Sequence, residues 1–207
     1  MCVSLPKTNP SCQRGISLIE LVMFIVIISV AVIGVLLVMN LTIAHSADPL
    51  VRKQSLAIAE SLLEEVELMP FTYCDPNDVN AASAVSTAGC SAGLSQDVIT
   101  GPTPNTETRY STTSPFDNVA DYSGCRMNMG IANGCDYAPY GIKDITGSNI
   151  SALNGYAAQV DITREGIALG LPVNDAALRI TVTVTGPDNI PVVLDGYRTR
   201  YAPNSVP

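Results

Sequence analysis

The stretch QRGISLIELVMFIVIISVAVIGVLLVM, residues 13–39, joins a polar, cationic leader to a long apolar run. No charged residue occurs from Leu21 to Ala44. About 20 apolar residues, each rising ~1.5 Å, match the ~30 Å hydrocarbon core of a bilayer, so the run predicts a membrane-spanning helix. One acid, Glu20, lies at the start of the run, shortly after Gly15. An ionised side chain is costly in hydrocarbon, so such a residue usually has a partner and a function.

The charges beside the run predict its orientation. The leader carries Lys7 and Arg14 and no acid. Positive charge in short flanks stays in the cytoplasm, which predicts a cytoplasmic N-terminus and an exported remainder. Two alternatives stay open. A buried core helix would normally carry polar residues along one face, and a cleaved export signal would be processed near Ala44, His45 and Ser46.

Cysteine usage indicates an oxidising compartment. The chain has six cysteines, of which Cys2 and Cys12 lie in the leader. The even number that remains predicts two disulfides, and these cysteines are Cys74, Cys90, Cys125 and Cys135. Four cysteines allow three pairings, and proximity favours Cys74 with Cys90 and Cys125 with Cys135. Zinc is the weaker alternative, because the chain has no C-x-x-C and only one histidine.

Several classes of function lack a sequence signal. The net charge of −8 offers no basic patch for nucleic acid. There is no Gly-rich phosphate loop, no G-x-S-x-G and no second histidine, so we expect neither an enzyme nor a cofactor or resident metal. The segment CDPNDVN brings Asp75, Asn77 and Asp78 together, which hints at calcium. It lacks the full EF-hand pattern, and an Asx-rich turn explains the same residues equally well.

After the apolar run, residues 45–71 (HSADPLVRKQSLAIAESLLEEVELMPF) predict that an amphipathic helix continues from the spanning one, with a kink near residues 46–49. Asp48 and Pro49 suit the N-cap and the first helical position, and Pro70 ends the pattern. The expected buried stripe consists of Leu56, Ala59, Leu63 and Val66, widened by Ile58 and Leu62. The expected solvated face consists of Glu60, Glu64, Glu65 and Glu67.

The rest of the chain predicts a loop region followed by a sheet. Residues 74–150 are rich in small and polar residues without periodicity, and contain or adjoin the four cysteines. Residues 156–163 and 178–185 then alternate apolar and polar side chains, and residues 190–202 follow the turn GPDN as a returning strand. Three antiparallel strands packed on the stripe of the second helix give an α+β fold.

The segment RGISLIELV resembles the prepilin cleavage and methylation motif of type IV pilins and pseudopilins. Gly15 matches the residue after which the prepilin peptidase cuts, and Ile16 matches the new, N-methylated terminus. Glu20 then falls at the fifth mature position, where the family's glutamate pairs with the N-terminal amine of a neighbouring subunit. Residues 47–71 are more loosely similar to minor pilins of the MshD type, from mannose-sensitive haemagglutinin pili.

The resemblance implies a pilin-like α+β fold with three parts: a cytoplasmic leader (1–15), a transmembrane and filament-core helix (16–48) and an exported domain (49–207). It implies a structural minor subunit that is inserted in the bacterial inner membrane and then assembled within or at the tip of a type IV pilus. The implied partners are other pilin subunits, prepilin peptidase, the assembly machinery and lipid. A type II secretion pseudopilin and a pilus-borne adhesive module are the alternatives.

Overall fold

The computed structural model of the protein describes residues 17–96 and 101–205. Its first element, α1 (Leu18–Leu68), is one helix of 51 residues with Pro49 inside it. Asp48 therefore lies within the helix and does not cap a new one. The chain divides between Ala47 and Asp48 into two units. Leu18–Leu68 thus contributes to both units, and its last turns belong to the C-terminal one.

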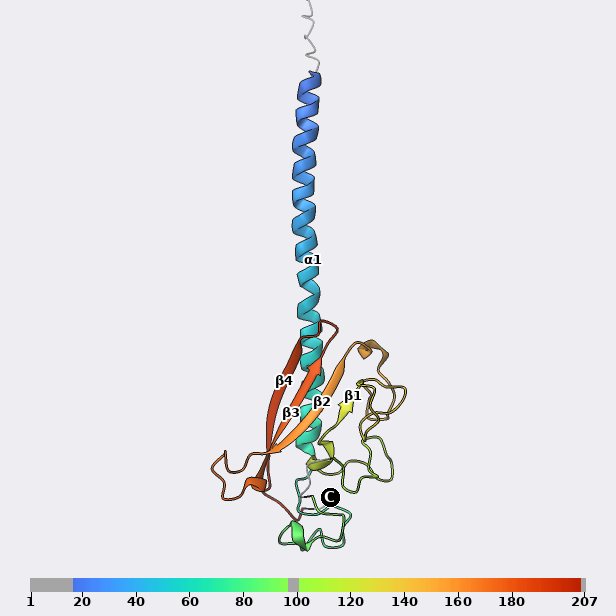
Figure 1. Ribbon diagram of the computed structural model, residues 1–207, viewed down its shortest axis with the longest axis vertical. Helices are drawn as coiled ribbons and strands as arrows, with labels where there is room; N and C mark the ends of the chain where they lie inside the picture. Colours follow the sequence, from blue (N-terminus) through green and yellow to red (C-terminus); the bar gives the residue numbers. More distant parts are fainter. Residues whose placement is uncertain (1–16, 97–100, 206–207) are drawn as a thin grey trace, which may run out of the picture. The chain divides into compact units, whose positions relative to one another are not determined.

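Four strands form one antiparallel sheet in the C-terminal unit, in the order β1-β2-β3-β4 (Figure 1). Their bounds are Arg126–Met127 for β1, Ala157–Arg164 for β2, Ala177–Thr185 for β3 and Pro191–Thr199 for β4. The three long strands confirm the expected meander. The two-residue β1 was not expected, because so short a strand shows no alternation. In the described ranges, short 3₁₀ helices occupy Thr87–Gly89 (η1), Val119–Tyr122 (η2), Ser151–Leu153 (η3) and Asn174–Ala176 (η4).

The turn between β3 and β4 is the one that the GPDN segment predicts. The backbone N–H of Asn189 donates to the carbonyl of Gly186 at 2.9 Å. Asn189 has φ of 57°, a left-handed conformation that asparagine tolerates better than most side chains. Thr185 consequently pairs with Pro191, and this register places alternate residues of both strands on the same face of the sheet.

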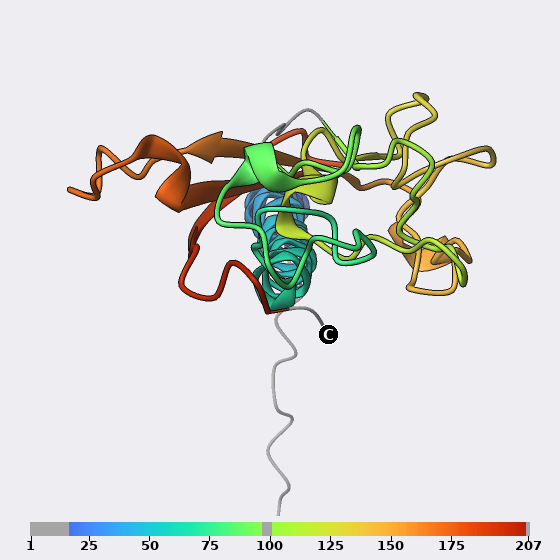
Figure 2. The same ribbon diagram turned by 90° about the horizontal axis from the view of Figure 1, so that it is seen from below.

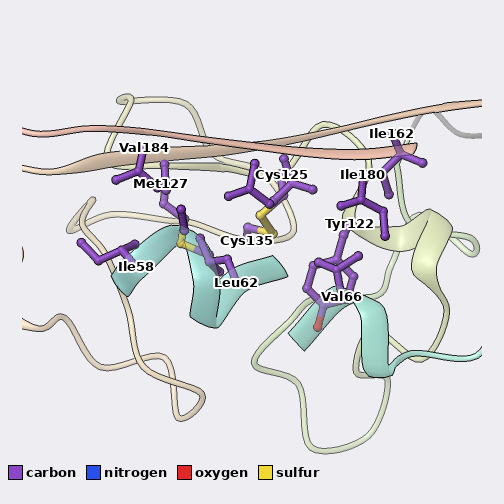
Figure 3. Packing of buried hydrophobic residues seen from close by; sticks show 14 of the residues in the cluster. Ile58, Leu62, Val66, Tyr122, Cys125, Met127, Cys135, Ile162, Ile180 and Val184 are labelled. Atoms are coloured by element: carbon purple, nitrogen blue, oxygen red, sulfur yellow. A yellow bond between two sulfur atoms is a disulfide. The ribbon is translucent and has the colours of Figure 1, made fainter. Parts of the chain in front are cut away.

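The core lies between the last turns of α1 and one face of the sheet (Figure 3). Ile58, Leu62 and Val66 of the helix face strand side chains such as Ile180 and Val184, all at most 8% exposed. The alternating residues of β2 and β3 are buried as the period of two predicts. Leu56 was expected in the stripe but is 37% exposed. The buried stripe contains Ser55, Ile58, Ala59, Leu62 and Val66.

Residues 70–156, here called the loop region, connect α1 to β2. Apart from β1 and the short 3₁₀ turns, the described part of this region is irregular. Its later loops, between β1 and β2, project on the opposite side of the C-terminal unit from the β2–β3 connection (Figures 1 and 2). Two disulfides, Cys74–Cys90 and Cys125–Cys135, close loops within it, as sequence proximity favours.

Candidate functional sites

The N-terminal unit presents an apolar helical surface. Leu18–Asn40 has a mean hydropathy of 3.3 and is long and apolar enough to cross a bilayer. Every side chain in this span is exposed. Soluble monomers rarely expose contiguous apolar patches beyond a few hundred Å², and larger ones mark contacts with lipid or protein.

Glu20 lies in the first turn of α1 and is exposed. A carboxylate near a helix N-terminus is favoured by the unpaired backbone N–H groups there. Gly15 and Ile16, the expected cleavage and methylation residues, lie outside the described residues. Glu20 is the only charged side chain between Ser17 and Asn40, so any specific electrostatic contact of this surface involves it.

The two disulfides differ in their surroundings. Each joins Cα atoms 5.4 Å apart. Cys125 and Cys135 belong to the main core, beside the side chains of α1 and the sheet (Figure 3). Cys74 and Cys90 belong to a small separate cluster with Ala81 and Ala84. The Cys125–Cys135 disulfide therefore extends the main core into the loop region. The Cys74–Cys90 disulfide lies at the centre of a second, smaller hydrophobic cluster.

A buried ion pair joins α1 to the loop region. Nε and Nη2 of Arg109 each donate to one carboxylate oxygen of Glu65 at 2.6 Å, and the side chains are 6% and 20% exposed. The hydroxyl of Tyr122 donates to the same carboxylate at 2.8 Å. Burial alone would lower the pKa of Arg109, but the hydrogen bonds and charge of Glu65 outweigh it and raise that pKa. Assigning Glu65 to the solvated face was therefore wrong, whereas Glu60 and Glu64 are exposed.

The CDPNDVN segment forms turns and not a shared cation site. Oδ1 of Asp75 accepts the backbone N–H of Asn77 at 2.6 Å, and Oδ1 of Asp78 accepts that of Asn80 at 3.0 Å. Asp78 also accepts the N–H and hydroxyl of Ser91 at 2.7 Å, and the hydrogen bonds from Asn80 and then from Ser91 lower the pKa of Asp78. Asp78 lies near Cys74 and Cys90, but both sulfurs are in a disulfide and are not metal ligands.

Asp75 instead meets acids that are distant in sequence. One carboxylate oxygen from each of Asp75, Glu107 and Asp117 lies within 4.8 Å of the other two. Burial, followed by the negative charges of Asp121, Asp117 and Asp75, raises the pKa of Glu107 to about 9. Burial and the charges of Asp75 and Asp121 raise the pKa of Asp117 to about 7. No local motif predicts this cluster, because its members come from separate loops.

In comparisons with known proteins, no family model, curated protein or solved structure matches the chain.

Proposed function

We propose that this protein is a minor structural subunit of a type IV pilus, made as a prepilin, cleaved after Gly15 and assembled through its apolar N-terminal helix. One observation carries the proposal. A cationic leader, Gly15, Glu20 and an uncharged apolar segment follow one another at the spacing of the prepilin motif. The helix that begins at Leu18 leaves Leu18–Asn40 exposed, which supports a role in which lipid and then neighbouring subunits cover it.

The chemistry of assembly follows from cleavage. Hydrolysis after Gly15 leaves a charged amine on Ile16, at the start of the apolar helix. In a filament core, a carboxylate from a neighbouring subunit would compensate that charge, and Glu20 is the acid available within the apolar segment. When an incoming subunit docks correctly, its charge pairs with that of its neighbour, and neither the amine nor the carboxylate is left uncompensated. The amine–carboxylate pair therefore favours correctly docked helices. The C-terminal unit would then form the outer surface.

Intact-mass measurement of the protein recovered from its native membrane tests processing. The expected mature chain begins at Ile16, with or without one methyl group, and retains all of Leu18–Asn40. A chain that begins after Ala47 would contradict the proposal, because the apolar helix would then have served only as an export signal.

Sheared filaments test assembly. Glu20→Ala makes the span more apolar, so insertion and cleavage are expected to continue. The variant should accumulate in the inner membrane and be lost from filaments at least tenfold. Glu60→Ala is the matched control, since it removes an exposed acid from the same helix outside the apolar segment, and it should assemble normally. Wild-type amounts of Glu20→Ala in filaments would remove the role assigned to this residue.

A further inference from the structure

The carboxylate cluster of the loop region contains unused acceptors. Asp75 and Glu107 are 0% and 2% exposed, yet Oδ2 of Asp75 and Oε2 of Glu107 have no hydrogen-bond partner among the described residues. Oδ1 of Asp117 is also buried without a partner there. Each of the three acids thus keeps an unpaired oxygen. A buried carboxylate oxygen without a donor is costly, so three in one place require a compensating group.

Basic side chains among the described residues do not supply that compensation. None of the salt bridges between described residues includes an acid of this cluster. The next charged neighbour is another acid, Asp121, which is 1% exposed. Burial and mutual repulsion together raise the pKa values of Glu107 and Asp117. In the absence of a cation, the cluster therefore favours proton uptake, and a protonated Glu107 carboxyl forms a hydrogen bond with Asp75.

The remaining oxygens hold the cluster in place. The backbone N–H of Asn77 donates to Oδ1 of Asp75, and its side-chain amide donates to Oδ2 of Asp117 at 2.9 Å. Oδ2 of Asp121 accepts the backbone N–H groups of Asp117 and Asn118 at 3.2 and 2.8 Å. Asn77 thus holds one carboxylate oxygen of Asp75 and one of Asp117, and Asp121 holds the backbone of Asp117. The second carboxylate oxygen of Asp75 and of Asp117 stays available.

We propose that Asp75, Glu107 and Asp117 bind a single calcium ion, which ties together three segments of the loop region. Oxygen-only donors suit a hard cation. The three oxygens lie within 4.8 Å of one another, close enough to reach one cation. Calcium suits the site better than magnesium, because magnesium demands near-ideal octahedral geometry and gives up its water reluctantly. Water would supply the remaining ligands of the ion.

Calcium titration of the full-length protein in detergent tests this site. After treatment with EGTA, isothermal titration with calcium chloride should show one ion bound per chain. Scanning calorimetry should show a higher unfolding temperature with calcium, by roughly 5–10 °C when calcium is about a hundredfold above its dissociation constant. Magnesium should produce a smaller shift at the same concentration. Identical unfolding temperatures with EGTA and with calcium, with no binding heat, would overturn the proposal.

Variants separate a ligand from a residue that only supports the fold. Because the pKa of Glu107 is raised to about 9, its carboxyl is neutral at pH 7 without calcium. Glu107→Gln should therefore unfold close to the wild-type temperature in EGTA. In calcium it should unfold below the wild type and bind the ion at least tenfold more weakly. Asp117→Asn, at a more exposed position of the cluster, should weaken calcium binding in the same way as Glu107→Gln. The control is Glu64→Gln, which changes an exposed acid on α1 and should respond to calcium as the wild type does. Wild-type calcium affinity in both cluster variants would refute the assignment.

Discussion

In the helix–sheet core, apolar side chains from α1 and from β2 to β4 pack at two regular periods, whereas the loop region buries polar and charged side chains together with apolar ones. Among the described residues, every buried polar or charged side chain except Ser55 lies between Thr72 and Lys143, inside the loop region. Apolar burial is non-directional, but a buried polar group needs a specific partner. The helix–sheet core is therefore specified by the periodic pattern of apolar residues, and the loop region by individual pairs of polar or charged groups.

The largest effect is expected where the two regions meet, at Glu65. Glu65→Gln removes the charge that compensates Arg109, which would remain buried. Breaking a buried ion pair on one side costs about 3–5 kcal/mol. Urea denaturation of the full-length protein in detergent should show this loss in the free energy of unfolding. Glu64→Gln, one residue away and exposed, should change it by less than about 0.5 kcal/mol. Equal losses in both variants would mean that the ion pair contributes nothing specific.

The next largest loss in the free energy of unfolding is expected for a substitution in the helix–sheet core. Leu62 is 4% exposed and packs against the sheet, so Leu62→Ala removes buried methyl groups and leaves a cavity. The expected cost is about 2–5 kcal/mol in the free energy of unfolding. Leu56→Ala is the same substitution on the same helix at a residue that is 37% exposed, and it should cost clearly less. If the two variants were equally destabilised, Leu62 would not belong to the core.

Removing the Cys74–Cys90 disulfide tests whether the two regions are separable. The bridge spans 16 residues, and closing a loop of this length stabilises a protein by about 3 kcal/mol in the chain-entropy model. In Cys74→Ala/Cys90→Ala, amide hydrogen exchange should speed up around these positions, while β3 keeps its protection. Equal loss of protection in β3 would show that the loop region and the core unfold as one unit.

The smallest expected effect concerns a polar contact within the loop region. Oδ1 of Asn118 accepts the N–H of Ala120 at the start of η2, and its amide donates to Thr72 Oγ1 at 2.7 Å. Asn118→Ala should cost about 1–2 kcal/mol by thermal unfolding, as for other lost caps and buried hydrogen bonds. The exposed Asn105 provides the control, Asn105→Ala, which should be close to neutral. A neutral Asn118→Ala would indicate that water replaces both contacts.

The same contrast explains what could be predicted from the sequence. β2 and β3 were predictable because one residue in two faces the core. The cysteine pairing followed from short separations. Glu65 was misassigned because its partner Arg109 lies 44 residues away, and helical spacing contains no information about that contact. The same limit applies to Asp75, Glu107 and Asp117, which are brought together only by the path of irregular loops.

The local reach of both disulfides has a mechanical consequence. Each closes a loop inside the loop region, so neither joins α1 to β2, β3 or β4 by a covalent bond. A tension applied along the chain from α1 to the C-terminal strands would pass through side-chain packing and through the hydrogen-bonded ladders of the sheet. Reducing agents should therefore leave that attachment at its original strength under load, while the loops between become extensible.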